Sequence, residues 1–217
     1  MDEYEEEYHR KIHERLLKNR HYYMFRAGYS KKNYIGYLKG SIFEFGCGMG
    51  QNIYLAKDHA VGFDISKFAV NECKKRGINA VNSLDKIKNK DGCLMVHVLE
   101  HVEEPLECLR EIKSKLNNNS RIVIVLPVYR RNKPETHDYG MDKSQHLYYW
   151  NFAAINALLK RAGFNVILNR FNYARGFSFF YTMPYWLAFA LTKMLGIITN
   201  TKEMIIVAEN SGENSIP

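Results

Sequence analysis

The sequence of 217 residues has few of the features that mark secreted or membrane-spanning proteins. Its four cysteines form no Cys-x-x-Cys pair, so neither a disulfide framework nor a zinc site is expected. The first residues are acidic and lack the basic start and apolar run of a signal peptide, which predicts a cytoplasmic location. The most apolar stretch, residues 177–199, is interrupted by Lys193 and is short for a membrane span. These absences favour one cytoplasmic domain of ordinary size.

The sequence also lacks a concentrated basic segment, although its formal net charge is +8. Such a charge would suit a nucleic acid or an anionic membrane surface. The lysine and arginine residues, however, are scattered along most of the chain. Nucleic acid is therefore not expected as the partner.

What the sequence does contain is a glycine-rich turn that follows an apolar strand, over Ile42-Phe43-Glu44-Phe45-Gly46-Cys47-Gly48-Met49-Gly50-Gln51-Asn52. A helix is predicted to follow this turn. Three glycines let a ligand approach backbone N–H groups that a Cβ atom would block. The dinucleotide-binding fingerprint would need a glycine where this chain has Gln51. The turn therefore indicates a different nucleotide-like cofactor, and the alternative is a tight turn without a ligand.

A second apolar strand, predicted over residues 60–66, carries Asp64 near its end. A carboxylate there is placed to accept hydrogen bonds from both ribose hydroxyls of a nucleoside. Ser66 is expected to cap the next helix and Gly77 to end it. The alternative for Asp64 is a simple turn residue.

A third signal is an apolar strand predicted after Asp91, which enters the turn His97-Val98-Leu99-Glu100-His101-Val102 before Pro105 opens a helix. This segment resembles the motif after strand four of small-molecule methyltransferases, including the ubiquinone-biosynthesis O-methyltransferases. The spacing Glu-x-Gly-x-Gly-x-Gly from Glu44 to Gly50 resembles motif I of the class I S-adenosylmethionine-dependent methyltransferases.

This resemblance implies S-adenosylmethionine as the cofactor. It places the glycine loop against the methionine part of the cofactor, Glu44 near its amino group, Asp64 on its ribose and Ser83 near its adenine. The residues expected to contact the cofactor are Glu44, Gly46, Cys47, Gly48, Gly50, Gln51, Asp64, Ile65, Ser83 and His97.

Two histidines are candidates for the chemistry. His101 would suit a general base, because an imidazole titrates close to neutral pH. Glu100 and His101 would alternatively bind a divalent metal, as a Glu-x-x-Glu-His pattern does in the ubiquinone enzymes, or simply fix the turn through hydrogen bonds. His97 stands where that pattern has its first glutamate, so no metal is expected. His146, which precedes a run of aromatic residues after a long polar loop over 129–149, is the second candidate base.

The resemblance implies an α/β fold, a Rossmann-like mixed sheet of seven strands with helices on both faces and the last strand antiparallel. Residues 1–40 are expected to form a helical lid or cap, with one helix over 2–26. The methyltransferase domain is expected over 41–209, with an aromatic insertion at 172–200, and 210–217 is expected to be a disordered tail. Five further strands and helices are predicted from apolar runs: strands at 79–82, 121–128, 164–171 and 203–209, and a helix at 152–162.

Two regions outside the motifs are expected to shape the site. The segment before the glycine loop often closes over the cofactor in this class, and here it carries Tyr22, Tyr23, Arg26 and Tyr29. The apolar run within the aromatic insertion, residues 177–199, would cover an apolar substrate, lie on a membrane surface, or pair two copies of the chain. An ordinary core helix is the alternative.

The sequence therefore predicts transfer of a methyl group from S-adenosylmethionine to a small, partly apolar acceptor. The acceptor is expected to present a hydroxyl, and a lipid-linked molecule or a cell-surface glycan precursor fits the aromatic insertion. The alternatives are an RNA methyltransferase, prompted by the basic charge, and a non-catalytic S-adenosylmethionine-binding subunit that docks a partner.

Overall fold

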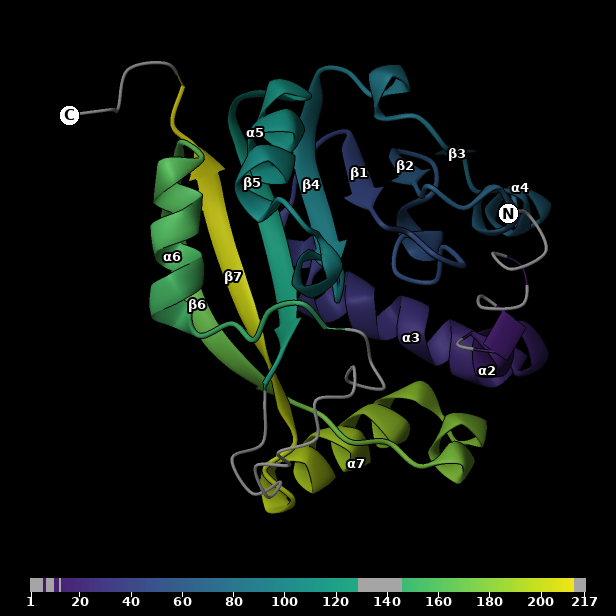
Figure 1. Ribbon diagram of the computed structural model, residues 1–217. Coiled ribbons are helices and arrows are strands. Elements are labelled where there is room, and N and C mark those ends of the chain that lie inside the picture. Colours follow the sequence, from purple (N-terminus) through teal and green to yellow (C-terminus); the bar gives the residue numbers. More distant parts are fainter. Residues whose placement is uncertain (1–5, 7–9, 12, 129–145, 213–217) are drawn as a thin grey trace.

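A seven-stranded sheet organises the chain (Figure 1), and the computed structural model describes residues 6, 10–11, 13–128 and 146–212. The strands lie in the order β3-β2-β1-β4-β5-β7-β6. Their bounds are β1 Ile42–Phe45, β2 Ala60–Phe63, β3 Ala80–Val81, β4 Lys90–Val96, β5 Leu116–Pro127, β6 Phe164–Tyr173 and β7 Lys202–Asn210. The first five strands pair in parallel, and β7 runs antiparallel to both β5 and β6. The predicted fold class is confirmed.

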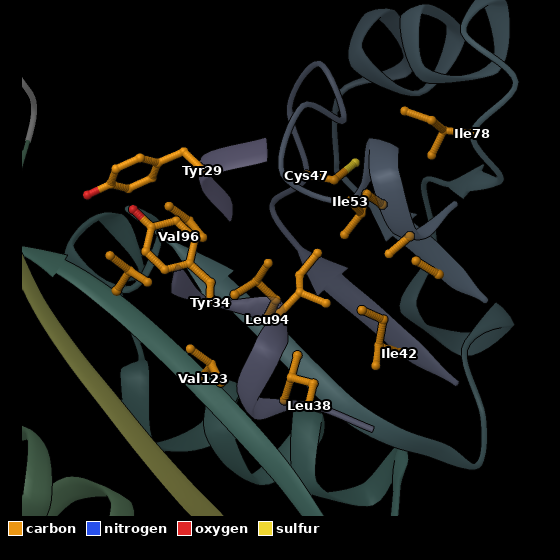
Figure 2. Close-up of a cluster of buried hydrophobic side chains, with 14 of the residues drawn as sticks. Tyr29, Tyr34, Leu38, Ile42, Cys47, Ile53, Ile78, Leu94, Val96 and Val123 are labelled. Carbon is orange, nitrogen blue, oxygen red and sulfur yellow. The ribbon is translucent and has the colours of Figure 1, made fainter. Parts of the chain in front are cut away.

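Alternate residues of the central strands point to opposite faces of the sheet, as the period of two requires. Leu94 and Val96 of β4 belong to one hydrophobic core, and Cys93 and Met95 belong to the other. Residues of α5 (Pro105–Ser114) and α6 (Phe152–Arg161) complete the second core. The first core, part of which Figure 2 shows, is completed by residues of α3 (Arg20–Asn33) and α4 (Lys67–Lys75). Both faces of the sheet are therefore buried, which explains the continuous apolar runs of β4 and β5.

Local capping residues set the ends of α4, as the sequence predicts, and also those of α6. The Ser66 side chain accepts a hydrogen bond from the Ala69 amide, and the helix that follows ends near Gly77, which has a φ of +71°. Asn151 caps α6 in the same way, and Gly163 follows that helix with a φ of +82°. Glycine tolerates this left-handed backbone, so each helix stops where the chain must turn back toward the sheet.

Two predictions of local structure are wrong, and a third is met only by a single short turn of helix. The described part of the predicted 2–26 helix is two helices, α2 (Glu14–Lys18) and α3, because Asn19 leaves the helical conformation and its side chain caps α3 through the Tyr22 amide. The short helix predicted after the glycine loop is present as a 3-10 helix, Tyr54–Ala56. It stays short because β2 begins at Ala60 and because Ile53 and Tyr54 are weak helix formers.

The second error concerns β5, which begins at Leu116 and not at Arg121. The polar residues at 117–119 suggest a turn, but Lys90 pairs with Leu116 and the register shifts before Gly92 pairs with Arg121. Asn119, with a φ of +60°, absorbs this irregularity. Tertiary pairing with β4 therefore overrides the weak strand preference of the asparagines.

The aromatic insertion forms a short 3-10 helix at Ser178–Thr182 and then α7 (Tyr185–Ile198). One side of α7 packs closely: Ala188, Thr192 and Gly196 are buried, and the Phe189 ring lies 5.7 Å from that of Tyr29 on α3. The opposite side leaves Trp186, Ile197 and Ile198 exposed. Among the described residues, no helix combines the length and apolar character that a membrane crossing requires.

The division at residue 40, the lid or cap role of the N-terminal segment and the disordered tail remain predictions. Asn210 is the last residue of β7, and residues 213–217 of the predicted tail lie outside the described part of the chain. Most of the predicted polar loop, residues 129–145, also lies outside it. Phe25, Tyr29, Tyr34 and Leu38 of the N-terminal segment belong to the first hydrophobic core.

Candidate functional site

The carboxyl ends of β1, β2, β3 and β4 meet at one edge of the sheet, because these strands are parallel. In Figure 1 the arrows of β1, β4 and β5 point toward this edge, which α3 crosses. In open α/β sheets ligands bind outside the carboxyl ends of the strands. The glycine loop, Asp64, Ser83 and His97 each follow one of these four strands, so the fold brings the predicted cofactor residues to a single edge.

The glycine loop has a left-handed backbone at all three of its glycines, with φ of +72° at Gly46, +51° at Gly48 and +73° at Gly50. Asp64 holds this loop closed: its Oδ2 accepts a hydrogen bond of 2.8 Å from the Gly48 amide and its Oδ1 accepts one of 3.0 Å from the Ser66 amide. Each carboxylate oxygen has a second lone pair to offer, so Asp64 can support the loop and still accept ribose hydroxyls.

Gly46 is expected to be essential for the shape of this loop. A Cβ atom there would lie 2.5 Å from Val98 Cγ2, and the φ of +72° is strained for any other residue. Gly46→Ala should therefore lower the free energy of unfolding by about 2–4 kcal/mol, measured by chemical denaturation. Gly36→Ala is the matched control, because its Cβ would meet only ordinary contacts, and an equal loss in both variants would contradict the argument.

Glu44, at the base of the loop, is completely buried. Its Oε1 accepts a hydrogen bond of 2.7 Å from Asn52 Nδ2, whereas its Oε2 has no hydrogen-bond partner among the described residues. Burial raises the pKa of Glu44 to about 8, the Asn52 hydrogen bond opposes this, and nearby Asp64 adds to it. An orphaned buried carboxylate oxygen beside a glycine loop fits a cofactor that supplies a cationic donor there, as the amino group of S-adenosylmethionine does.

The remaining predicted cofactor residues differ in how exposed their side chains are and in the partners that these side chains have. Ile65 exposes 83% of its surface beside Asp64, which leaves an apolar face available to an adenine ring. Ser83 lies next along this edge, and its hydroxyl is 3.4 Å from Asp85 Oδ2. Gln51 is nearly buried, and its Oε1 has no partner among the described residues. Cys47 points into the core, with its Sγ 3.9 Å from Cys73 Sγ, so only its backbone faces the loop.

His97 is held between two carboxylates. Its Nε2 lies 3.2 Å from Glu203 Oε2, and its Nδ1 lies 3.6 Å from Glu100 Oε1. Desolvation alone would lower the pKa of His97, which still exposes 39% of its side chain, but Glu100 and Glu203 together raise this pKa to about 9. The imidazole is therefore a cation at neutral pH, and a protonated imidazole does not ligate a metal. Its backbone φ of +54° is unusual for a residue with a side chain and marks a constrained position.

The two candidate bases come together although they are far apart in the sequence. The His101 and His146 rings lie 4.9 Å apart between their centroids. The ligand atoms of these histidines and a carboxylate oxygen of buried Glu100 lie within 4.8 Å of one another. The amides of Leu147 and Tyr148 donate to the Glu100 carbonyl, which ties the segment after the long loop to the segment after β4. The arrangement suits proton transfer and would also accommodate one divalent cation.

Two residues near the site, Glu203 and His13, were not predicted from the sequence to belong to it. Glu203 is the second residue of β7 and pairs with His97. An acidic residue just before the apolar run of this strand was the available signal. His13, which reads as a surface residue, approaches the glycine loop: its Nε2 would lie 3.4 Å from a Cβ atom at Gly48. Nothing in the local sequence indicates that contact, because it depends on how α2 lies over the loop.

The fold and the loop define a nucleotide-cofactor-binding α/β enzyme of the class I S-adenosylmethionine-dependent methyltransferase type. Residues 2–169 match the family described as "Methyltransferase domain", and the chain belongs to this family. Its methyl donor is S-adenosylmethionine. No curated protein matches the sequence significantly.

Solved structures share the fold at low sequence identity. A S-adenosylmethionine-dependent methyltransferase from Archaeoglobus fulgidus has a TM-score of 0.57 and 20% identity, covering 85% of this chain and 94% of its own. A methyltransferase complexed with the Trm112 activator from Haloferax volcanii has a TM-score of 0.64 and 14% identity, covering 97% and 98%. Magnesium protoporphyrin IX methyltransferase from Synechocystis, with bound S-adenosylmethionine, has a TM-score of 0.55 and 14% identity, covering 88% and 80%.

Proposed function

We propose that this methyltransferase transfers the methyl group to a hydroxyl of a small, partly apolar acceptor, with His101 and His146 as the proton-accepting pair. The adjacency of these two imidazoles at the cofactor edge carries the proposal. Methyl transfer to a hydroxyl requires loss of its proton, and a base within hydrogen-bond reach speeds such a step by roughly 10²–10⁴-fold. The rest of the acceleration would come from holding the acceptor oxygen in line with the sulfonium methyl group.

An apolar cavity that is separate from the histidine pair supports a partly apolar acceptor. It has a volume of about 530 Å³ and lies between α3 and the insertion, lined by Phe25, Leu55, Tyr181 and Met183 among others. Phe25 and Tyr181 also line a smaller polar cavity, so the two cavities share a wall. In more detail, we propose a cytoplasmic enzyme that takes up a lipid-linked or glycan precursor. The exposed side of α7 would lie against a membrane or a second copy of the chain.

Single alanine variants of His101 and His146 are expected to lose about 10²-fold or more in turnover, and the double variant little more than either single. Non-additivity is expected because the two rings act as one unit. Methyl transfer from radiolabelled S-adenosylmethionine, with a panel of hydroxyl acceptors, measures this. His59→Ala, at an exposed site, is the control. Full turnover in both single variants would show that neither histidine is the base.

Removal of divalent metals with a chelator is expected to leave turnover unchanged, since a base needs no cation. A loss of turnover that is restored by adding back one divalent metal would instead assign Glu100, His101 and His146 to metal binding.

A further inference from the structure

A second cavity, polar and smaller, lies between α3, the segment after β6 and the start of β7. Its volume is about 240 Å³, and the residues that matter for its chemistry are Arg15, Tyr22, Arg26, Tyr34, Thr192 and Glu203. Pockets for drug-sized ligands are typically ~300–1,000 Å³, so this cavity suits a smaller molecule or one end of a larger one. No residue predicted to contact the cofactor is among the described residues that line it.

Glu203 connects this cavity to the catalytic edge. It pairs with Pro127 in the sheet register, which places it at the carboxyl end of β5. Its carboxylate reaches His97, the residue that follows β4. The cavity therefore adjoins the edge where the methyl group is presented, beside the predicted cofactor residues rather than among them.

The carboxylate of Glu203 is already satisfied by the protein. Its Oε1 accepts hydrogen bonds of 2.5 Å from the Tyr34 hydroxyl and 2.6 Å from Asn172 Nδ2, and its Oε2 faces the His97 imidazolium. Burial opposes ionisation of Glu203, but the bonds from His97 and Tyr34 keep its pKa below its ordinary value. Figure 2 shows the Tyr34 hydroxyl turned away from Ile42 and Leu38 and toward the side where the Tyr29 hydroxyl lies.

Two guanidinium groups, those of Arg26 and Arg15, also line the cavity. Arg26 is half-buried and forms no hydrogen bond or ion pair with the residues that the structure describes. Burial opposes its charge, but Tyr34, Tyr22 and Glu203 keep its pKa raised. Arg15 lies at the exposed rim, where its guanidinium stacks 4.4 Å from the Tyr22 ring centre and donates to Ser178. Thr192, 3% exposed, also lines the cavity with a hydroxyl that has no partner among the described residues.

We infer that this cavity binds a carboxylate of the methyl acceptor through Arg26, with Arg15 at the rim, so that the acceptor is a small organic acid. The inference rests on the proposed function, because it concerns the acceptor of the same reaction. A guanidinium fork matches the two oxygens of a carboxylate. A doubly charged phosphate would be repelled more strongly by Glu203, so a singly charged group fits better. The tyrosine and phenylalanine rings of the walls would pack against the body of the acid.

The test uses benzoate and its neutral isostere benzamide as probes, titrated by NMR into the full chain saturated with S-adenosylhomocysteine. Benzoate is expected to bind at least about tenfold more tightly than benzamide. Arg26→Gln should remove this preference, while benzamide and S-adenosylhomocysteine bind as before. Arg26→Lys, which keeps the charge but loses the fork, should lose part of it. Arg20→Gln, an exposed arginine on the same helix, is the matched control.

Three results would overturn the inference: equal binding of the two probes, no detectable benzoate binding, or unchanged benzoate binding in Arg26→Gln. Weakened S-adenosylhomocysteine binding in Arg26→Gln, with benzoate binding intact, would show that Arg26 holds the carboxylate of the cofactor instead. If Arg26→Gln does not fold, the preference of the wild type for benzoate and its partial loss in Arg15→Gln and Arg26→Lys still decide the matter. Because these are binding measurements, they stand apart from the turnover of the histidine variants, which tests the proposed function.

Discussion

Asp64→Ala is expected to reduce the affinity for S-adenosylmethionine by roughly 100-fold or more. The carboxylate accepts hydrogen bonds from the Gly48 and Ser66 amides, and it is the group expected to hold the ribose. Hydrogen bonds to a charged group contribute about 1.5–3 kcal/mol each, and 1.4 kcal/mol corresponds to a tenfold change in affinity. Removal of this carboxylate therefore removes the direct contact with the ribose and also disturbs the shape of the glycine loop.

Calorimetric titration with S-adenosylmethionine, S-adenosylhomocysteine and NAD measures this effect. The wild type is expected to bind the two sulfur compounds and not NAD. Asp58→Ala is the matched control, because Asp58 is exposed before β2, and it should bind like the wild type. If Asp64→Ala binds S-adenosylmethionine as tightly as the wild type does, Asp64 is only a turn residue and another group binds the ribose.

Glu44→Gln is expected to make the protein more stable at alkaline pH while it weakens cofactor binding. The pKa of Glu44 is about 8 in the folded protein, against an ordinary value near 4.5. The folded state therefore keeps a proton that the unfolded state loses between these two values. The stability of the wild type should fall as pH rises from about 4.5 to about 8, by a few kcal/mol, and stay low above that. Glutamine carries no charge, so the variant should not show this fall.

Denaturation midpoints of wild type and Glu44→Gln between pH 5 and pH 9 test the stability, with Glu111→Gln at an exposed site as the control. Binding of S-adenosylhomocysteine provides a second measurement. If its amino group meets an ionised Glu44, the wild type should release about one proton at pH 7, and Glu44→Gln none. Titrations in two buffers with different ionisation enthalpies count this proton. Parallel pH profiles of wild type and variant would show that Glu44 is ionised in the folded protein.

Local chemistry explains why the sequence predicted so much of the fold. The buried strands carry apolar runs that need no partner to be recognised, as at Ile122–Leu126. The caps at Ser66 and Asn151 depend on a side chain and an amide three residues apart. The glycine loop depends on backbone angles that glycine adopts most easily, and Asp64 is fixed by its place at the end of β2. Where tertiary pairing competes with these signals, as at Asn119, the sequence prediction was wrong.

The sequence by itself determined the class of enzyme, because motif I is formed by residues that are near one another in the chain, and the strand order was implied by the family resemblance that this motif carries. Only the tertiary structure decided which distant side chains meet. The contact of His101 with His146, the ion pair of His97 with Glu203 and the cavity beside Arg26 each join segments that are distant in the sequence. The pKa of a group depends on such neighbours and on burial, so the charge of His97 and the retained proton of Glu44 arise only once the chain is folded.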